Sequence, residues 1–432
     1  MLGSSGPLEC TVARGHRSMF RRNAPFFDVR RKAWFVSSDR TPPASLRSVV
    51  SLFTGCGGME LGLEAAGFRT AVCVEIDEHC NRTLEANRPS WRRVEPGDVT
   101  KLSAGEILAA AGLEPGRAGL VTAGVPCQSF STMGKEEGTS CDEGNLFAHF
   151  IRIVKEAMPA GFVFENVAGI LKHEGVLEAI AGMADDLGYR MSARVLNAAD
   201  YGAPQNRNRL IVLGLRGRSR EAPAPAFPWP THAEDPVGFS AWYASRGLAV
   251  PEPSPWATVR GCFAAIDYEE VRRMEARGEC HSMSISPLMA DRIRCIRPGT
   301  RDNFKALPEA LRPPCWRTGP DGVLKYQAND TFGRLDPGRP SVTIRTCGYH
   351  PMKGRYLHPT LDRGLNTVEL SRLQGFPSEW RFVGNLTSVS RQIGNAVPPP
   401  LAEAIGRAMA AQLAPLAAAR PDPAAVGVAH EE

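Results

Sequence analysis

Short apolar runs alternate with helical patterns from residue 47 to residue 215, and this alternation constrains the fold more than any other feature of the chain. Strand, helix and strand in repeated succession predict an α/β fold with a mostly parallel sheet covered on both faces. In such a sheet, ligands bind at the carboxyl ends of the strands, so the loops that follow the strands are expected to carry the chemistry. We expect strands at 48–53, 70–75, 119–123, 161–165, 190–196 and 210–215, and helices at 59–66, 77–87 and 400–413. Ser103 and Glu106 form a capping-box pattern that predicts a further helix ending at residue 111.

The periodicity weakens at about residue 221, where prolines become frequent. We therefore predict two domains. The catalytic and cofactor-binding domain covers 47–220 and is completed by 386–414, while a smaller, irregular and turn-rich domain covers 221–385.

The two ends of the chain differ in composition from the part between them. Residues 1–46 carry many arginines with little apolar periodicity, and we interpret them as a basic N-terminal extension. Residues 415–432 are rich in alanine and proline and are interpreted as a disordered tail.

Composition narrows the class of protein further. The 432 residues are 43% hydrophobic and 22% charged, values typical of a soluble globular protein. There is no apolar run of about 18 residues, so no membrane span is expected. The first residues do not resemble a secretory signal. None of the eleven cysteines forms a C-x-x-C pair, which argues against a metal site. Their odd number, without a secretory signal, predicts free thiols in a reducing, cytoplasmic compartment.

A net charge of +5 does not by itself indicate a nucleic-acid partner. The arginines of 207–220 and 292–301 are clustered, however, and such clusters either contact phosphates or form solvated faces.

The loop after the first predicted strand is glycine-rich, running from Phe53 to Gly58. Glycines between a first strand and a first helix allow a cofactor to approach the backbone closely, although a tight structural turn has the same pattern. Glu75 ends the second strand, where a carboxylate is well placed to bind ribose hydroxyls. Asp98 offers a further carboxylate for an adenine amino group. The alternative to cofactor binding, for both Glu75 and Asp98, is helix capping or an exposed surface charge.

Three further loops carry reactive or polar side chains. Cys127 directly follows Pro126 after a predicted strand, which suits an exposed nucleophile, although most lone cysteines are buried apolar thiols. Glu165 follows a buried apolar run, and a partly buried carboxyl can stay protonated and donate a hydrogen bond. In the segment 205–209, alternation predicts that Gln205, Arg207 and Arg209 share one face, where they bind a nucleotide or form a structural ion-pair network.

These motifs, in this order, resemble the DNA cytosine-5 methyltransferase family over about residues 47–412. The ordered set is F-x-G-x-G-G at 53–58, P-C-Q at 126–128, E-N-V at 165–167, Q-x-R-x-R at 205–209, the segment 363–377, and G-N-A-V-P-P at 394–399. The family often has aspartate where Ser51 stands, although serine also occurs there. The segment 141–147 lacks the arginine usual before its Leu-Phe, and Thr-x-Arg-Glu is imperfect at 366–369.

The resemblance implies a class I S-adenosylmethionine-dependent methyltransferase sheet, which is Rossmann-like, with a smaller, irregular target-recognition domain. It also implies S-adenosylmethionine as methyl donor and no metal. The cofactor-binding residues would be Phe53, Gly55, Gly57, Gly58, Glu75, Ile76, Asp98, Val99, Pro126, Asn395 and Val397. DNA contacts would come from Gln128, Ser131, Lys135, Gln205 and Thr343.

The resemblance also assigns catalytic roles. Cys127 would add to carbon 6 of a flipped-out cytosine, and protonated Glu165 would hydrogen-bond ring nitrogen 3. Arg209 would hold the base carbonyl, and Arg207 would position Glu165 or a phosphate. The expected partners are double-stranded DNA and a cognate restriction endonuclease that acts separately. We expect a monomer in the cytoplasm of a bacterium, at the nucleoid.

Two other functions fit part of the pattern. A tRNA cytosine-5 methyltransferase would share the catalytic motifs, but the variable region of about 150 residues favours readout of a double helix. A non-catalytic DNA-binding regulator would not require Cys127 and Glu165, and both are present.

Overall fold

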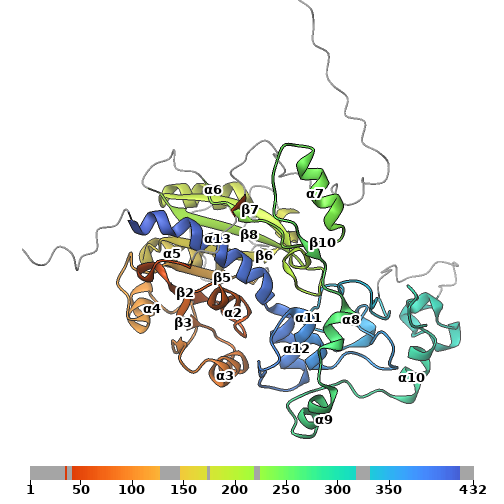
Figure 1. The fold of residues 1–432 in the computed structure, drawn as a ribbon. Helices are drawn as coiled ribbons and strands as arrows, with labels where there is room; N and C mark the ends of the chain where they lie inside the picture. The colour runs from red at the N-terminus through yellow and green to blue at the C-terminus, as the bar shows by residue number, and fades with distance from the viewer. Residues whose placement is uncertain are drawn as a thin grey trace, which may run out of the picture.

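The computed structural model describes residues 35–36, 41–126, 146–172, 176–217, 224–317 and 331–418 of the chain. A seven-stranded sheet with the order β4-β3-β2-β5-β6-β8-β7 organises the larger part of it (Figure 1). Its strands are β2 (Ser48–Leu52), β3 (Arg69–Val74), β4 (Arg92–Arg93), β5 (Leu120–Gly124), β6 (Gly161–Val167), β7 (Tyr189–Asn197) and β8 (Asn208–Arg216). Neighbouring strands are parallel, except that β8 runs antiparallel to both β6 and β7. The predicted α/β class and mostly parallel sheet are confirmed.

Helices cover both faces of this sheet. One face packs against α4 (Ala104–Ala111), α5 (Leu146–Ala157) and α6 (Val176–Asp186), through a buried cluster that includes Ile107, Phe150 and Ile180. The other face packs against α2 (Gly58–Ala65) and α13 (Pro399–Ala418), which lie side by side in Figure 1. The predicted capping box is present at the start of α4, where Ser103 and Glu106 bond each other's backbone N–H groups.

Short elements connect the strands and helices of the larger part. They are α3 (Glu78–Asn87), which follows β3, and the 3-10 helices η3 (Ala44–Leu46), η5 (Ala168–Lys172) and η6 (Ala198–Tyr201). Asp77 begins α3, because its side chain accepts a hydrogen bond from the Cys80 N–H.

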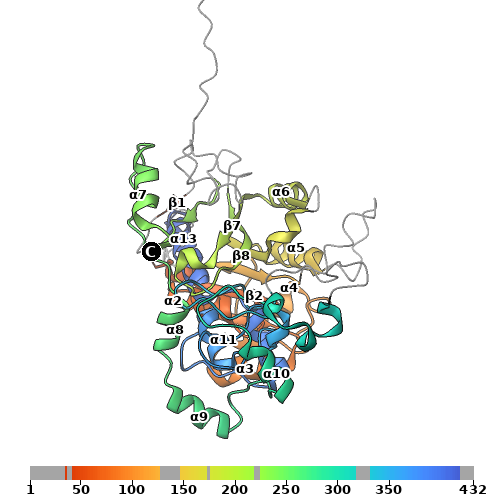
Figure 2. The same cartoon turned by 90° about the vertical axis from the view of Figure 1, so that its right-hand side faces the viewer.

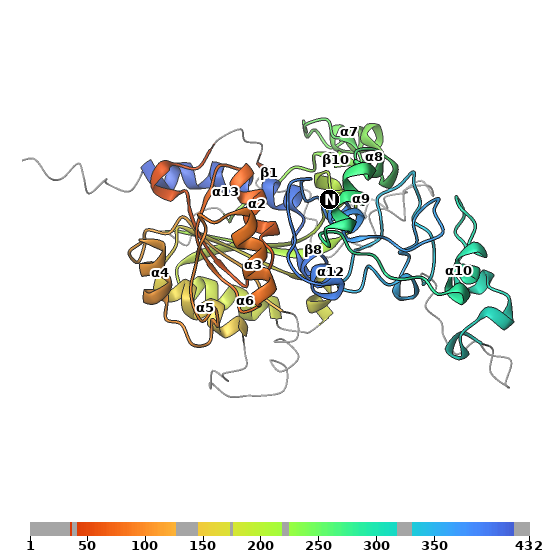
Figure 3. The ribbon, with the colours of Figure 1, turned by 90° about the horizontal axis from the view of Figure 1, so that it is seen from below.

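A second, smaller part lies to one side of the sheet, as Figures 1 and 3 show. It contains α8 (Val259–Ala264), α9 (Tyr268–Ala276), α10 (Pro287–Arg294), α11 (Thr367–Gln374), α12 (Leu386–Asn395) and the 3-10 helices η7 (Phe304–Ala306), η8 (Glu309–Leu311), η9 (Pro314–Trp316) and η10 (Pro351–Lys353). Two apolar clusters stabilise it, one around Leu370 and Ile393 and one around Phe304 and Trp316. No strand of the seven-stranded sheet belongs to this part, in agreement with the predicted irregular domain.

The division between the two parts differs from the predicted boundaries. Residues 224–257, with β9 (Phe227–Pro228), β10 (His232–Ala233), α7 (Pro236–Ala244) and β11 (Ser254–Pro255), lie along the larger part (Figure 2). Phe227 is buried in the cluster under α13, and the Tyr201 hydroxyl donates to the Pro228 carbonyl at 3.1 Å. The helix α12 contacts both parts: it packs with α11 in an apolar cluster of the smaller part, while the Thr83 hydroxyl donates to Gln392 Oε1 at 2.7 Å from the larger part.

Ordered structure also reaches beyond the predicted ends. Within the predicted N-terminal extension, β1 (Phe35–Val36) pairs with β9, and Leu46 is buried in the core. At the other end, α13 continues to Ala418, past the predicted limit at residue 414. Among the described residues, no helix is long and apolar enough to cross a membrane.

Candidate active site

A cavity of about 620 Å³ opens at the carboxyl ends of β3, β2, β5 and β6. This volume is in the range of small-molecule and cofactor sites. One wall comes from the segment between α12 and α13, which the fold returns to the sheet from far along the chain. Ten of the eleven residues predicted to bind the cofactor line this cavity: Phe53, Gly55, Gly58, Glu75, Ile76, Asp98, Val99, Pro126, Asn395 and Val397.

Gly57 is the exception, and the structure contradicts its assignment to the cofactor site. Its φ of 86° lies in the left-handed region that favours glycine. A Cβ added here would lie 2.9 Å from the Leu84 side chain and 3.0 Å from that of Trp91. Gly57 therefore turns the chain into α2 against an apolar cluster and faces away from the cavity.

Gly58 has a steric role at the cavity wall. A Cβ here would lie 2.4 Å from the Val397 carbonyl oxygen, so α2 and the returning chain can approach this closely only at a glycine. We expect Gly58→Ala to lower the free energy of unfolding by about 1–3 kcal/mol, as other overpacked sites do.

Gly182→Ala is the matched control for that substitution, because nothing lies within 4 Å of a Cβ added to this residue of α6. Replacing glycine by alanine inside a helix is expected to stabilise the fold by roughly 0.5–1 kcal/mol. Denaturant unfolding of both variants measures the difference. Equal stability of the two would contradict the close approach at Gly58.

Glu75 lies at the end of β3 with its carboxylate held in place. Oε2 accepts a hydrogen bond from the Gly55 N–H at 2.6 Å, and Oε1 accepts one from the Asp77 N–H at 2.7 Å. Burial raises the pKa of Glu75, and these two N–H groups oppose the shift. The glycine loop and the acid therefore form one preorganised unit. Beside them, Ile76 is 70% exposed and presents apolar surface to the cavity.

Asp98 lies at the same end of the cavity. Its Oδ1 accepts hydrogen bonds from the Thr100 hydroxyl at 2.7 Å and from the Thr100 N–H at 3.0 Å. The hydroxyl bond lowers the pKa of Asp98 and keeps it ionised. An ionised carboxylate can accept a hydrogen bond from an amino group of a ligand.

Glu165 and Arg209 form an ion pair at the opposite end of the cavity. The distance from Arg209 Nε to Glu165 Oε1 is 2.7 Å, and both side chains are largely buried. Burial raises the pKa of Glu165, while the charges of Arg209 and Arg207 lower it. The cavity therefore has two acids, Glu75 and Asp98, at one end and the Glu165–Arg209 ion pair at the other.

Asn166 was not among the predicted site residues, although it stands in the E-N-V motif. Its Nδ2 donates to the Val125 carbonyl at 2.9 Å, and Asn166 is 1% exposed. Val125 and Pro126 directly precede Cys127, so this bond positions the chain at the point where the predicted nucleophile follows. The motif itself was the signal that could have identified this role.

Arg207 has a structural role that was not predicted, beside its charge interaction with Glu165; its predicted role in positioning Glu165 or a phosphate stays a prediction. It is 1% exposed, and its guanidinium donates to the Ile344 carbonyl at 2.8 Å and to the Gly394 carbonyl at 2.7 Å. Both of these bonds join the sheet to segments distant in sequence. Arg207 therefore holds together the two parts that form the cavity.

Removing this buried guanidinium should be costly. We expect Arg207→Met to lower the free energy of unfolding by about 3 kcal/mol, because two carbonyls lose a charged donor. Arg216→Met is the control, since Arg216 also donates to a carbonyl, that of Met158 at 2.6 Å, but at an exposed position. Its loss should cost only about 0.5 kcal/mol. Urea unfolding of both variants tests this, and an equal cost would contradict the junction role.

Gln205 is a correction at this junction, because it was predicted to contact DNA. Its side chain is fully buried. Oε1 accepts a hydrogen bond from the Ile344 N–H at 2.7 Å, while Nε2 donates to Gln374 Oε1 at 2.6 Å. With both ends of the amide engaged inside the protein, Gln205 is a structural residue.

Of the other predicted DNA contacts, Thr343 lies within the described residues. The Thr343 hydroxyl donates to the Asn206 carbonyl at 2.7 Å and is partly exposed, so Thr343 stays a prediction. The predicted nucleophile Cys127 and the predicted DNA contacts Gln128, Ser131 and Lys135 lie outside the described residues. Arg391, which was not predicted, lines the cavity and pairs with Asp77 at 2.6 Å.

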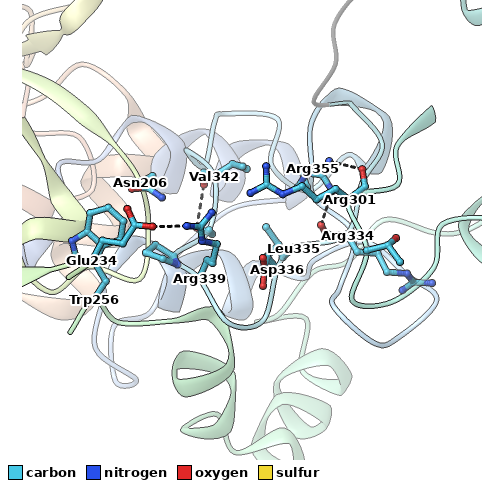
Figure 4. Close-up of a pocket in the computed structure, with 13 residues that line it drawn as sticks. Asn206, Glu234, Trp256, Arg301, Arg334, Leu335, Asp336, Arg339, Val342 and Arg355 are labelled. Atoms are coloured by element: carbon cyan, nitrogen blue, oxygen red, sulfur yellow. Dashed lines mark hydrogen bonds and ion pairs between the residues drawn. The ribbon is translucent and has the colours of Figure 1, made fainter. Parts of the chain in front are cut away.

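A second cavity, of about 510 Å³, is lined by residues of both parts and is rich in arginine (Figure 4). Arg339 forms an ion pair with Glu234, and Arg355 donates to the Arg334 carbonyl at 3.1 Å. Arg301 also lines this cavity. Arginines gathered in a groove are typical of phosphate contacts.

In the predicted arginine cluster at 292–301, most of the side chains are satisfied within the protein. Arg292 donates to the Leu311 carbonyl, Arg294 pairs with Asp291, and Arg297 pairs with Asp302. Of the cluster at 292–301, Arg301 is the member that lines the arginine-rich cavity. Among the residues that the structure describes, no group of three or more His, Cys, Asp or Glu side chains is placed to hold a metal ion.

Comparison with known proteins agrees with this architecture. The chain is 32% identical over 387 residues to the type II methyltransferase M.PspPI of Psychrobacter, covering 85% of this chain and 80% of that protein. It is 33% identical over 367 residues to M1.HphI of Haemophilus parahaemolyticus, covering 83% and 86%. A putative DNA modification methyltransferase encoded within an E. coli prophage has a similar fold, with a TM-score of 0.56 and 24% identity over 84% of this chain and 98% of that one.

The family model for C-5 cytosine-specific DNA methylases matches residues 47–411, which include every strand of the sheet and both cavities. The chain therefore belongs to the C-5 cytosine-specific DNA methylase family and is a DNA (cytosine-5-)-methyltransferase.

Proposed function

We propose that this enzyme transfers a methyl group from S-adenosylmethionine to carbon 5 of a cytosine flipped out of a specific double-stranded DNA sequence, through a covalent adduct with Cys127. The single observation that supports this most strongly is the shape of one cavity. It places the Glu165–Arg209 pair at one end and the acids Glu75 and Asp98 at the other. A methyl donor and its acceptor can thus meet in one site.

S-Adenosylmethionine is the methyl donor that family membership implies, and the lining residues suit it. Glu75 would accept hydrogen bonds from the ribose hydroxyls, and Asp98 one from the adenine amino group. The exposed Ile76 side chain would cover the adenine ring, while Asn395 and Val397 would close the site. Bound there, the cofactor supplies an electrophilic methyl group.

Cytosine carbon 5 is too weak a nucleophile to take a methyl group unaided. In our proposal the Cys127 thiolate forms a bond to carbon 6, which makes carbon 5 enamine-like. Glu165 donates a hydrogen bond to nitrogen 3 and stabilises the charge that develops on the ring, while Arg209 holds the base carbonyl. After carbon 5 is methylated, its proton is lost and the bond from Cys127 to carbon 6 breaks.

Access to carbon 6 requires the base to leave the duplex, at a cost of a few kcal/mol. The arginine-rich cavity between the two parts offers cationic side chains for the backbone of the opened DNA. Gln128, Ser131, Lys135 and Thr343 remain our predicted further contacts. The relatives are named type II methyltransferases, and we propose a cognate restriction endonuclease that acts separately. We also propose that the enzyme acts as a monomer.

Methyl transfer to two alternative substrates, DNA and tRNA, tests the proposal. The purified enzyme is incubated with methyl-labelled S-adenosylmethionine and either mixed genomic duplex DNA or total tRNA. Label recovered as 5-methylcytosine in DNA supports the proposal. Label that enters tRNA alone contradicts it and favours a tRNA methyltransferase, while DNA binding without any label in either substrate favours a non-catalytic regulator.

A further inference from the structure

A buried carboxylate beneath the middle of the cofactor cavity has no part in the function described so far. Glu60 lies in the first turn of α2, is 2% exposed and lines the cavity. Its Oε1 accepts hydrogen bonds from the Ser51 hydroxyl at 2.7 Å and the Thr122 hydroxyl at 3.5 Å. Its Oε2 has no hydrogen-bond partner among the residues that the structure describes.

Among the described residues, no cationic side chain compensates this carboxylate. The groups of the described chain that act on Glu60 are neutral hydroxyls, backbone, and the acid Glu75, which is itself negative when ionised. Buried charges in proteins are ordinarily paired, because leaving one alone in a low-dielectric interior is costly. When Glu60 is ionised, a ligand cation bound against it would supply the partner that its charge and its Oε2 lack.

The position of Glu60 also accounts for a departure in the sequence. The family that this chain resembles often has aspartate where Ser51 stands. Here the Ser51 hydroxyl of β2 donates a hydrogen bond to Glu60 of α2. A carboxylate therefore lies next to position 51, but α2 and not β2 supplies it.

The order of strands places Glu60 along the length of the cofactor. Asp98 and Glu75 lie beyond the ends of β4 and β3, Ser51 and Thr122 lie on the adjacent central strands β2 and β5, and Glu165 lies on β6. Adenine and ribose therefore belong at one end and the target base at the other. The methionine part of the cofactor must lie between them, because the methyl group has to reach the base.

That methionine part carries two cationic groups, the sulfonium and the α-ammonium. The ammonium has three hydrogen-bond donors, whereas the sulfonium has none. The Oε2 atom of ionised Glu60 is a hydrogen-bond acceptor without a partner among the described residues, so it suits the ammonium, which can donate a hydrogen bond, better than the sulfonium, which cannot.

We propose that Glu60 binds the α-ammonium group of the methionine moiety of S-adenosylmethionine and so orients the methyl donor. The proposal rests on the proposed function, since it requires this cavity to bind that cofactor.

Glu60→Gln tests the proposal, because glutamine has nearly the same shape and can still accept the Ser51 hydrogen bond. Calorimetric titration would measure the Kd of three ligands. These are S-adenosylmethionine, S-adenosylhomocysteine, which keeps the ammonium, and 5′-methylthioadenosine, which lacks the amino-acid part. Losing a charged hydrogen bond should raise the first two Kd values about 10-fold to 100-fold. The third should not change.

Two further variants show whether the effect belongs to the carboxylate. Glu64→Gln is the control on the same helix, because Glu64 pairs with Arg88 at 2.8 Å and does not line the cavity, and it should leave all three Kd values unchanged. The double variant Ser51→Asp, Glu60→Gln puts an acid back on β2 and should recover most of the lost affinity.

The dependence on pH gives an independent readout. Burial raises the pKa of Glu60 to about 7, and the other titratable groups acting with it are Glu75 and the neutral thiols of Cys56 and Cys73. A cation bound beside Glu60 favours the ionised form, so affinity for S-adenosylmethionine should rise between about pH 6 and pH 7 in the wild type, below the pH at which an α-ammonium group loses its proton. In Glu60→Gln that rise should shrink to the part that Glu75 contributes.

Several results would overturn the assignment. Glu60→Gln with unchanged affinity for S-adenosylmethionine would exclude it, and so would weakened binding of S-adenosylmethionine alone, which would point to the sulfonium. Equal weakening of all three ligands would indicate a damaged cavity. If the wild type bound none of them, the proposed function would itself fail, which is a distinguishable outcome.

Discussion

Cys127→Ser is expected to lower methyl transfer to DNA by at least about 10³-fold while leaving cofactor and DNA binding nearly intact. A cysteine thiol is a few per cent ionised at neutral pH, whereas a serine hydroxyl is essentially un-ionised, so the bond to carbon 6 would almost never form. Single-turnover transfer of labelled methyl to a DNA that contains the recognition sequence measures the loss.

Cys315→Ser is the matched control, because Cys315 is an exposed thiol of the smaller part and does not line the cofactor cavity. It should retain wild-type transfer. Residual activity above about a tenth of the wild-type activity in Cys127→Ser would show that Cys127 is not the nucleophile. Unchanged Kd values for cofactor and DNA would show that the loss is chemical.

Glu165→Gln is expected to lower the rate constant of methyl transfer by about 10²–10³-fold. The amide can still occupy the site, but it is a weaker donor to nitrogen 3 at the moment when charge develops there. Because burial raises the pKa of Glu165, the acid form persists to higher pH than for an ordinary glutamate. Transfer that depends on this form should therefore decline as pH rises through the folded-state pKa, and the variant should lack that decline.

Glu156→Gln serves as the control for this substitution, since Glu156 lies on α5 at a surface ion pair with Arg152. It should preserve both the rate and its pH profile. A Glu165→Gln enzyme with the wild-type profile would mean that Glu165 acts as a structural partner of Arg209 and not as an acid.

Local patterns predicted most of the sheet and the cavity because each signal depends on neighbouring residues. The apolar run at 48–52, the glycines after it and the acid at Glu75 all follow from rules about one strand and the turn behind it. Since parallel strands end at the same edge of a sheet, those turns were bound to meet in one site.

What could not be predicted depends on partners distant in the chain. An apolar run such as 210–215 has the same composition in either direction, so the antiparallel orientation of β8 had no local signal. The amide of Gln205 is polar in sequence but buried, because Gln374 and Ile344 happen to satisfy it. Phe227 follows a proline-rich stretch, yet it fills a space beneath α13 and so moves the domain boundary.

Covalent trapping on DNA made with 5-fluorocytosine in place of cytosine tests whether Cys127 forms a bond to carbon 6 of the target base. Fluorine at carbon 5 cannot leave as a proton does, so an adduct that has been methylated cannot release the enzyme. We expect a denaturant-resistant enzyme–DNA complex that needs S-adenosylmethionine, is absent in Cys127→Ser, and yields a peptide containing Cys127 joined to the base. A complex that forms equally well with Cys127→Ser, or the absence of any complex with an enzyme that methylates ordinary DNA, would contradict it.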